Sequence, residues 1–488
     1  MTERKQDLAA GIEREFGPGV LAMLGESRPN HLTTVDELDL TDSGLAAIVA
    51  KAAGDGFRRC NDTSEWRADD GRVWVGGEAA VKQLERTVLN IGRQLYDRAP
   101  GLESGLAKRA SSFALRARSD AGVRAVMSRL AAVEGLACTS DIFDKGPELL
   151  NVANGTIDLR TGELRGHQRA DFITRLIDLP YDAEADAERW KRFLQEAFEP
   201  HPELVEYVAL AIGYAATGLM AEHVFHLLIG LGRNGKSTFV ETVAGVLGDY
   251  GLAIAADTLA RSHDLQRPRP DIALMRGRRF VYSQESNRGT PLDEALIKKL
   301  TGGDTISARL LHSNPMNFKS VAKVFMSTNH APEITGTETA IWRRVRLIPF
   351  HVSFAGREDV SLSRKLEAER AGILAWIVRG AGRYLAEGLQ APAVVTAATD
   401  EYRKQSDQFG RFLDECVDFI EGANVAAQRL QGAYKAWAAN GGEHVQRDTL
   451  LAEYLASNGV PKTHTRRGKV YAGISLKPEF SSDENRYA

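Results

Sequence analysis

The sequence predicts an α/β protein whose central region forms a sheet with a nucleotide at the carboxyl ends of its strands. Two observations lead to this prediction. Residues 205–355 contain short apolar runs separated by segments of helical spacing, and these runs read VFHLLIG, RRFVYSQE, AKVFMSTN and RRVRLIPF. In addition, the glycine-rich stretch GLGRNGKSTF, residues 230–239, directly follows the first run.

The glycine-rich stretch has the spacing of a Walker A loop, with Gly230, four residues, and then Gly235-Lys236-Ser237. A strand-like run precedes it and KSTFVETVAGVLG continues with helical spacing, so a chance match is the weaker explanation. Backbone N–H groups of such a loop face phosphate oxygens, Lys236 can reach the β- and γ-phosphates, and Ser237 can ligate Mg²⁺. ATP and Mg²⁺ are therefore the expected ligands. The expected nucleotide-binding residues are Gly230, Gly232, Asn234, Gly235, Lys236, Ser237 and Thr238.

Polar residues end two further strand-like runs. Glu285 ends RRFVYSQE, where it could orient the metal's water shell, the attacking water, or both, and it joins Ser237 as a candidate magnesium residue. The alternative for a lone strand-end glutamate is a surface residue. Asn329 ends AKVFMSTN, where its amide can hydrogen-bond the γ-phosphate or the attacking water.

Three arginines, Arg343, Arg344 and Arg346, stand beside the last apolar run. Strand alternation predicts Arg344 and Arg346 on one face and Arg343 on the other. An arginine that contacts a transferring phosphoryl group stabilises its charge, and if a neighbouring subunit supplies it, the active sites lie at subunit interfaces. The alternative is a set of surface arginines at a strand edge.

The remaining chain organises around this centre. Residues 1–200 read as a mixed α/β region with two hairpin signals, EWRADDGRVWVGG and LLNVANGTIDLRTGELRGH. Asp69-Asp70 falls in the first of these, where paired acids usually only make the turn. GGDTISARLLHSNPMNFKSVAK predicts another hairpin around SNPMN, and KTHTRRGKVYAGISLK is a basic hairpin-like segment in which Tyr471 could stack on a base. A boundary is expected near 390–410.

The net charge and the cysteine spacing narrow the class of protein. The chain has 488 residues and a net charge of −3, so nucleic acid would have to be contacted through local basic patches. One such patch, residues 107–129, carries six cations against one acid, for which a solvated helix face is favoured. The three cysteines are widely spaced and predict neither a disulfide framework nor a zinc site, which suits a reducing cytoplasm. The charged N-terminus predicts no signal peptide, and no membrane span is expected.

The ordered motifs GLGRNGKS, RRFVYSQE, IKKLTGGDTISARLLH, FMSTNHAPEI and WRRVRLIPF resemble those of superfamily 3 helicases. The likeness is greatest to the poxvirus-type primase-helicases of phages, plasmids and prophages. LLNVANGTIDLRTGELRGH is similar to a hairpin region of that family's N-terminal helicase-associated domain. LQGAYKAWAANGG and RRGKVYAGISLK resemble its C-terminal winged-helix-like domain.

The resemblance implies an AAA+-like P-loop core at 201–390, a helicase-associated α/β region at 1–200 and a winged-helix-like DNA-binding domain at 391–488. It implies an ATP-fuelled ring, usually a hexamer, that translocates on single-stranded DNA. Lys236 and Ser237 then form the Walker A pair, Glu285 is the Walker B acid and Asn329 the sensor. Arg344, or Arg343 close behind, is the finger. The single acid at the Walker B strand departs from the paired acids of many viral relatives.

The family's channel hairpin makes Arg309, His312 and Lys319 candidate DNA contacts, with local ion pairing or simple solvation as the alternative. The C-terminal basic segment adds Arg466, Arg467 and Lys469. We find no cysteine–histidine zinc cluster and no aspartate pair typical of a primase, so a separate primase or polymerase is an expected partner.

The sequence thus predicts a replicative DNA helicase of a phage, prophage or plasmid, located in the bacterial cytoplasm. Two rivals stay open. One is an ATP-dependent replication initiator or loader without processive unwinding, and the other is a P-loop small-molecule kinase, which would be a monomer.

Overall fold

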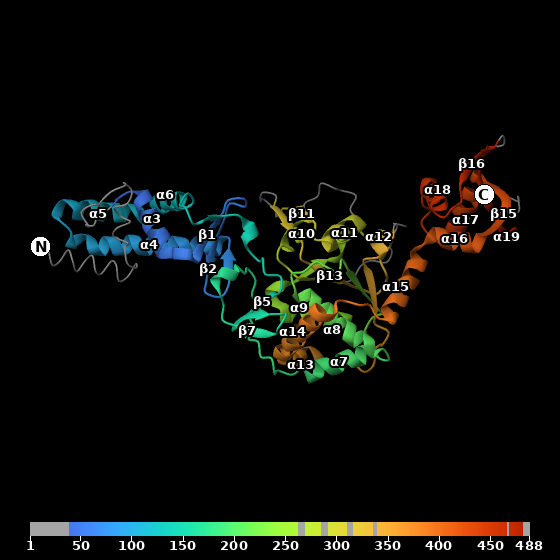
Figure 1. The fold of residues 1–488 in the computed structure, drawn as a ribbon, viewed down its shortest axis with the longest axis horizontal. Helices are drawn as coiled ribbons and strands as arrows, with labels where there is room; N and C mark the ends of the chain where they lie inside the picture. The colour runs from blue at the N-terminus through green and yellow to red at the C-terminus, as the bar shows by residue number, and fades with distance from the viewer. Residues whose placement is uncertain are drawn as a thin grey trace.

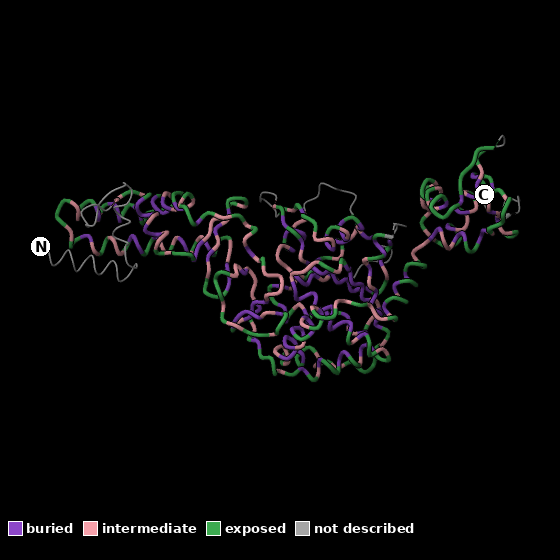
Figure 2. Tube along the Cα trace, viewed as in Figure 1, coloured by how far each residue is buried: buried purple, intermediate pink, exposed green. Residues whose placement is uncertain are grey.

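The computed structural model forms an elongated molecule, with the helices of residues 42–130 at one end, a central sheet flanked by helices, and a C-terminal unit at the other end (Figure 1). The structure describes residues 39–261, 269–284, 291–309, 316–334, 339–465 and 468–481. Buried residues run through the central strands and the helices beside them (Figure 2).

The N-terminal part combines a helical bundle with a small sheet. Its helices are α3 (Asp42–Ala53), α4 (Glu78–Arg98), α5 (Ser104–Ala117) and α6 (Asp120–Leu130), and its strands are β1 (Phe57–Cys60), β2 (Glu65–Asp69), β3 (Trp74–Gly76) and β4 (Ala137–Cys138), in the order β3-β2-β1-β4. Leu84, Val88 and Ile91 lie on one face of α4 and are buried in the bundle's core, as their helical spacing requires. The side-chain hydroxyl of Ser119 accepts a hydrogen bond from Gly122 N and caps α6.

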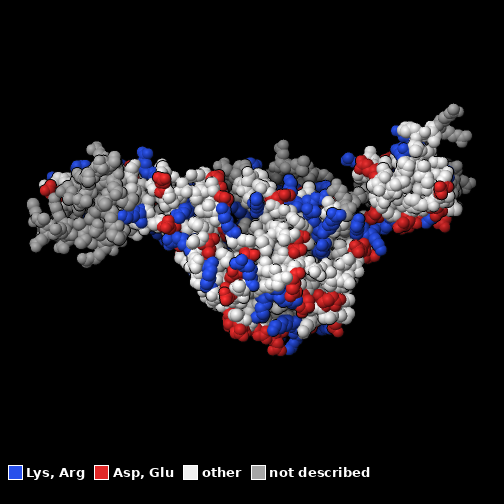
Figure 3. Space-filling view, in the orientation of Figure 1, with Lys and Arg blue, Asp and Glu red and all other residues white. Residues whose placement is uncertain are grey.

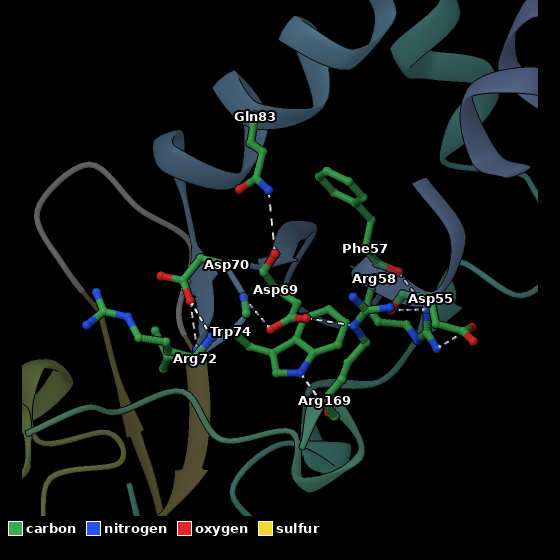
Figure 4. Close-up of polar contacts among 11 residues, drawn as sticks. Asp55, Phe57, Arg58, Asp69, Asp70, Arg72, Trp74, Gln83 and Arg169 are labelled. Atoms are coloured by element: carbon green, nitrogen blue, oxygen red, sulfur yellow. Dashed lines mark hydrogen bonds and ion pairs between the residues drawn. The ribbon is translucent and has the colours of Figure 1, made fainter. Parts of the chain in front are cut away.

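The first predicted hairpin is confirmed, because β2 and β3 pair antiparallel with Asp69 opposite Trp74. Figure 4 shows how its two acids are used. The Asp70 carboxylate accepts from the backbone N–H groups of Arg72 and Val73, and the Asp69 carboxylate accepts from Gly71 N and from Arg169 Nε at 2.7 Å. Both acids therefore hold the turn, and Asp69 also ties it to Arg169, a hundred residues further along the chain.

Two cysteines that are widely spaced in the sequence lie side by side in the fold. Cys60 and Cys138 are register partners on the parallel strands β1 and β4, and their Sγ atoms are 3.7 Å apart. Both are free thiols. Burial raises the pKa of the Cys138 thiol to about 12, so it is protonated at neutral pH.

The central sheet has five parallel strands in the order β14-β8-β13-β10-β9. They are β8 (Phe225–Ile229), β9 (Gly251–Ala255), β10 (Phe280–Gln284), β13 (Lys323–Thr328) and β14 (Val345–Pro349). All four predicted apolar runs are therefore strands, and both faces of the sheet are buried, since Leu228 packs in one hydrophobic cluster and Leu227 in another. This mixed α/β architecture with a parallel sheet agrees with the predicted fold class.

Helices cover both faces of the sheet (Figure 1). One set, packed in the larger cluster, is α7 (Glu188–Phe198), α8 (Pro202–Ala216), α9 (Lys236–Leu247), α13 (Leu362–Ala368) and α14 (Arg370–Glu387). The other is α10 (Pro270–Leu274), α11 (Glu294–Gly302) and α12 (Thr339–Trp342), beside the predicted hairpin of β11 (Thr305–Ala308) and β12 (Met316–Lys319). Short 3-10 turns are Gly54–Gly56, Ala99–Gly101, Ser140–Ile142, Arg169–Asp171, Gly248–Tyr250 and Ala256–Thr258.

The second predicted hairpin also forms, as the antiparallel strands β5 (Leu149–Val152), β6 (Gly155–Asp158) and β7 (Glu163–Arg165). Leu150 and Ile157 of this small sheet belong to the same hydrophobic cluster as Trp190 of α7. The same cluster continues beyond residue 200, into α8, α9 and β8.

Helices α8 and α14 cross where two glycines meet. A Cβ added at Gly213 would lie 2.2 Å from the carbonyl carbon of Gly380, so only glycine permits this approach.

The carboxyl end of α8 is held by two buried cations: Arg279 donates to Ala216 O at 2.7 Å and Lys323 donates to Thr217 O at 2.5 Å. These cations face the negative end of the helix dipole, and burial lowers the pKa of both.

The C-terminal unit follows α15 (Ala393–Ser406) and contains α16 (Gln408–Cys416), α17 (Ala427–Asn440), α18 (Asp448–Ser457) and α19 (Pro478–Ser481). Its antiparallel sheet, in the order β15-β17-β16, is built from β15 (Val417–Ala426), β16 (Lys462–Thr465) and β17 (Gly468–Leu476). Helix α15 packs on the central core through Tyr402, and a separate cluster begins at Phe409.

The predicted C-terminal hairpin is confirmed as β16–β17. The expectation that Tyr471 stacks on a base is wrong, because its side chain is buried in the C-terminal core under the Lys462 ammonium group. Among the described helices, none combines the length and apolar character that crossing a bilayer requires.

Candidate nucleotide site and arginine pair

The glycine loop, residues 230–235, joins the end of β8 to the start of α9 at the carboxyl edge of the sheet. The ends of β10 and β13 lie at the same edge, because all three strands are parallel. A cleft of about 240 Å³ opens there. Its lining residues are Gly232, Arg233, Asn234, Gly235, Lys236, Ser237, Thr238, Gln284, Ser327, Thr328 and Asn329.

Two glycines give the loop its path. A Cβ at Gly230 would lie 2.5 Å from Phe350 O, so the loop passes too close to the chain after β14 for any side chain. Gly235 has φ +83 and a Cβ there would lie 2.8 Å from the ring of Phe193. The sharp turn into α9 at Lys236 therefore depends on glycine.

Asn234 ties the loop to the segment that follows β14. Its side chain is only 3% exposed, and its Nδ2 donates to Phe350 O at 3.0 Å and to Val352 O at 2.8 Å. Next to it, the carbonyl of Arg233 accepts a hydrogen bond from Phe354 N. The amide nitrogen of Asn234 therefore holds the loop in shape, and the predicted contact of this residue with a nucleotide stays a prediction.

Lys236 lines the cleft and is 6% exposed. Its Nζ donates to Gly230 O at 2.8 Å and to Asn329 Oδ1 at 3.1 Å. Both partners are neutral oxygens, and burial lowers the pKa of Lys236. In the described part of the chain, no carboxylate is among the hydrogen-bond partners of the Lys236 ammonium group. An anionic group that enters the cleft would therefore meet a cation bonded only to neutral oxygens there.

Hydroxyl and amide groups complete the described part of the cleft. Ser237 is exposed toward it from the first turn of α9, and Ser327 and Thr328 are buried at the end of β13. Gln284 ends β10 and donates to Glu241 Oε1 at 2.9 Å. The next residue, the predicted Walker B acid Glu285, lies outside the described residues.

The arginine pair lies at the amino ends of the parallel strands, opposite the glycine loop at their carboxyl ends. Val345, which follows Arg344, is level with Phe225 at the start of β8, whereas the loop follows Ile229 at the end of β8. The predicted alternation of Arg343, Arg344 and Arg346 is wrong, because Arg343 and Arg344 form a turn after α12 and only Arg346 lies in β14.

The three arginines also differ in their contacts. Arg343 is exposed, whereas Arg344 is partly buried and donates from Nε to Thr301 Oγ1 at 3.1 Å and from Nη1 to Ala340 O at 2.9 Å. Arg346 donates to the carbonyls of Arg343 and Val345. Within one chain none of them lines the cleft around Lys236.

Two candidate DNA residues lie on the β11–β12 hairpin. Arg309 directly follows β11 at the turn end, and Lys319 pairs with Thr305 at the base of the hairpin, so they occupy opposite ends. Both are exposed. The third candidate, His312, lies outside the described residues.

The C-terminal candidate Lys469 is exposed on β17 opposite His464, and Arg466 and Arg467 lie outside the described residues.

The six cations predicted as a solvated face, from Lys108 to Arg129, are all exposed on or beside α5 and α6. Figure 3 shows both signs of charge mixed over the visible face of the central core, in keeping with the low net charge. DNA contact at any of these positions stays a prediction.

One feature of the region was not predicted from the sequence. A groove of about 1200 Å³ runs from the glycine loop along α15 to the C-terminal unit. It shares Gly232, Asn234 and Asn329 with the smaller cleft. Its walls come from segments up to about 200 residues apart, such as Ile229 and Gln446, so no local motif could have indicated it.

Two family models match parts of the chain. Residues 46–199 match a family described as "D5 N terminal like", and residues 228–344 match a family of unknown function, DUF5906. The chain is 30% identical over 297 residues to "Putative helicase L207/L206" of Acanthamoeba polyphaga mimivirus, covering 56% of this chain and 31% of that protein. The chain is therefore similar to the D5-like primase-helicase family, and these findings are consistent with its helicase portion.

Other relatives carry replication-related names as well. The chain is 25% identical over 303 residues to "Putative primase C962R" of an African swine fever virus isolate, covering 56% of this chain and 31% of that protein. It is 26% identical over 243 residues to "Putative helicase 121R" of Invertebrate iridescent virus 3, covering 47% of this chain and 26% of that protein. The chain thus spans about a third of the length of the curated relatives it matches, or less.

Among solved structures, the chain is similar to the apo structure of the NrS-1 C terminal region (305-718). The two are 9% identical, the match covers 86% of this chain and 96% of the other, and the TM-score is 0.45.

Proposed function

We propose that this protein is an ATP-dependent replicative DNA helicase with an AAA+-like P-loop core, in which a homo-oligomeric ring, typically a hexamer, translocates on single-stranded DNA. The observation that carries the proposal is the meeting of Lys236 and Asn329 in one cleft at the carboxyl edge of the sheet. A glycine loop with a buried lysine and a polar amide from a neighbouring strand is the arrangement that binds and senses a nucleoside triphosphate.

The residues present fit a magnesium-bound triphosphate. The cleft offers the Lys236 ammonium without a carboxylate among its described hydrogen-bond partners, and the exposed hydroxyl of Ser237 stands beside it. Ser237, together with Glu285, would hold Mg²⁺. The metal, when bound, neutralises charge on the phosphate oxygens, while Lys236 holds the same oxygens and Asn329 orients a water or the terminal phosphate.

The arginine pair supports an oligomer. Arg343 and Arg344 lie at the edge of the sheet opposite the glycine loop, so neither serves the site of its own chain. A neighbouring copy in a ring could present its arginine edge to this cleft, where a guanidinium would stabilise phosphoryl transfer. A monomeric small-molecule kinase predicts no role for either arginine in a neighbouring copy's site.

DNA contact is assigned to exposed basic positions. In the proposed ring, Arg309 and Lys319 of the β11–β12 hairpin face the channel, and the β16–β17 hairpin with Lys469 acts as the wing of a winged-helix-like DNA-binding domain. The hairpin precedes β13 in the chain, and Asn329 directly follows the end of β13. Nucleotide state at Asn329 could therefore be transmitted along β13 to the hairpin.

The proposal is tested by unwinding of a forked duplex with a labelled strand. Purified wild-type protein with ATP and Mg²⁺ should release the strand, and Lys236→Ala should not, although it binds the fork. ATP turnover that DNA stimulates, without release of the strand at any protein concentration, would refute the helicase assignment and support an ATP-dependent initiator or loader.

A further inference from the structure

Cys60 and Cys138 are placed so that a covalent bond between them needs little movement. They are register partners on the neighbouring parallel strands β1 and β4, and their Sγ atoms are 3.7 Å apart. Neighbouring strands lie about 4.8 Å apart, within the Cα separation of roughly 4.4–6.8 Å that a disulfide spans. The two sulfurs would have to approach to about 2.05 Å, a change that side-chain rotation can supply.

The backbone is held on both sides of Cys60. Arg59 N donates to Leu136 O, and Asn61 N donates to Cys138 O at 3.0 Å. Strand β4 is only 2 residues long, and among the described strands it pairs with β1 alone. These two hydrogen bonds therefore keep the sulfurs opposite each other although β4 is very short.

The surroundings of the pair are apolar. Trp74 and Phe143 are buried in one cluster with Cys60, and Phe172 and Cys138 pack against it. Among the described residues, no group of three histidine, cysteine or acidic side chains could hold a metal ion, so the pair is not part of a multi-ligand metal centre there. Two thiols in contact can instead be joined by oxidation.

The two thiols differ in access. Cys60 is fully buried, whereas Cys138 is partly exposed. An oxidant from solvent therefore meets Cys138 first, and Cys60 is the thiol that can react with the oxidised sulfur. Burial raises the pKa of both thiols, and the charges of Arg58 and Arg67 offset only part of that rise, so the reaction is slow at neutral pH.

From this geometry we infer that Cys138 is an oxidation site and that Cys60 converts its oxidised form to a disulfide that joins β1 to β4. The oxidant is a hydroperoxide, with hydrogen peroxide as the simplest case. The Cys138 sulfur takes one peroxide oxygen as the O–O bond breaks, which gives a sulfenic acid and releases water.

The second step closes the bridge. The Cys60 sulfur attacks the Cys138 sulfur, the S–O bond breaks, and the hydroxyl leaves as water with the Cys60 proton. The two thiols thus lose two electrons, and the peroxide becomes two water molecules. A small thiol reductant reverses the bond by thiol–disulfide exchange. This chemistry is independent of nucleotide binding.

The bridge would tie the ends of a large loop. Cys60 and Cys138 are 78 positions apart, and α4, α5 and α6 lie between them. A cross-link over a loop of this length restricts the unfolded chain and so stabilises the folded one. Oxidation is therefore expected to stabilise the N-terminal part of the protein.

Mass spectrometry of the full chain tests the inference. The protein is treated with hydrogen peroxide, unfolded, alkylated with N-ethylmaleimide and digested. We expect a cross-linked pair of peptides that contain Cys60 and Cys138, lighter by two hydrogens than the reduced pair, and dithiothreitol should restore alkylation of both. Cys416 is the matched control, because it is as fully buried as Cys60 but lies in the C-terminal core, and it should be alkylated throughout.

Two variants separate the steps, and circular dichroism checks that each is folded. Cys60→Ser should leave Cys138 as a sulfenic acid that dimedone traps, and Cys138→Ser should leave Cys60 reduced. Oxidised wild type should unfold at least about 5 °C above the reduced protein, and neither variant should show this shift.

Four results would overturn the inference. Peroxide could leave all three cysteines open to alkylation, or link Cys138 only between two copies of the chain. It could oxidise Cys138 while Cys60 is still alkylated in the wild type. The bridge could also form without raising the unfolding temperature, which would refute its stabilising role.

Discussion

The ammonium group of Lys236 lies 3.1 Å from Oδ1 of Asn329, so the glycine loop and the end of β13 share a hydrogen bond across the site. The same ammonium donates to Gly230 O, within its own loop. A triphosphate that draws Lys236 toward its oxygens would weaken the bond to Asn329 and free that amide for the terminal phosphate or a water. In the proposed site, Asn329 would therefore respond to the nucleotide without being needed to hold it.

Replacing Asn329 should therefore separate binding from turnover. We expect Asn329→Ala to bind ATP within a few-fold of wild type, because Lys236 and the loop remain, but to hydrolyse it about 10²-fold more slowly, the scale seen when one stabilising polar group is removed. Equilibrium ATP binding and steady-state phosphate release measure the two effects. His330→Ala, at the exposed next position, is the control and should keep its turnover. Unchanged turnover in Asn329→Ala would remove this residue from the proposed chemistry.

Asn234 is expected to stabilise the conformation of the glycine loop. Asn234→Ala leaves the buried carbonyls of Phe350 and Val352 without their shared donor, at a cost of about 1–3 kcal/mol in the free energy of unfolding. Asn234→Asp should cost more, because a carboxylate oxygen would then face both carbonyls. Arg233→Ala removes an exposed ion pair with Glu358 and should cost less than about 1 kcal/mol. Urea unfolding of the three variants gives the order, and an aspartate variant more stable than the alanine variant would contradict it.

The local patterns of the chain predicted its local structure well. The apolar runs became strands, and the turn signals Asp-Asp-Gly and Asn-Gly became hairpins, because both depend on residues close in sequence. The strand preceding the loop and the helix following it also placed Lys236 correctly at the start of α9.

Features that depend on distant segments were missed for a physical reason. The alternation predicted for Arg343 and Arg344 failed because both residues lie in a turn between the end of α12 at Trp342 and the start of β14 at Val345. Cys60 and Cys138 meet only because β1 and β4 pair across the intervening helices. The tether from Asn234 to Val352 likewise joins residues more than a hundred positions apart, a contact that periodicity does not encode.

The arginine pair predicts complementation between inactive subunits. Lys236→Ala cannot use its own site, and an arginine variant cannot complete its neighbour's, so mixing the two should restore part of the ATP turnover. We expect this for Arg344→Ala or Arg343→Ala, and comparison of the two identifies the finger. Thr301→Val is the control for Arg344, since it removes the hydroxyl that the guanidinium contacts and keeps the charge. A protein that light scattering shows to be a monomer under turnover conditions would rule out an arginine supplied in trans.

Two glycines in helices should respond to alanine in opposite directions. Gly213→Ala places a Cβ 2.2 Å from the backbone of Gly380, so α8 and α14 must separate, at a cost of about 1–3 kcal/mol or more. A Cβ at Gly245, within α9, meets nothing within 4 Å, so Gly245→Ala should stabilise the helix by about 0.5–1 kcal/mol. Thermal unfolding of both variants measures the two shifts. A stabilised Gly213→Ala variant would mean that the two helices do not cross at this point.

His226 predicts an acid sensitivity of the central sheet. Its side chain is fully buried on β8, its ring stacks on Phe325 with centroids 4.4 Å apart, and its Nε2 lies 3.3 Å from the Tyr207 hydroxyl. Burial, aided by the charge of Arg346, lowers its pKa from 6.5 to about 3. The folded state therefore keeps this imidazole neutral at pH values where the unfolded chain protonates it.

The direction in which stability changes with pH follows from the number of protons bound by the folded and the unfolded chain. Between about pH 6.5 and pH 3 the unfolded chain binds the extra proton, so the free energy of unfolding falls as the pH falls, by up to about 1.4 kcal/mol per pH unit from this group. His226→Phe keeps the ring stacking and removes the titration, although Tyr207 loses its partner and the variant is less stable at pH 7. From pH 7 to pH 5, wild type should lose about 2 kcal/mol more than His226→Phe in urea unfolding. Equal losses in the two proteins would show that His226 does not enter the folded core as a neutral ring.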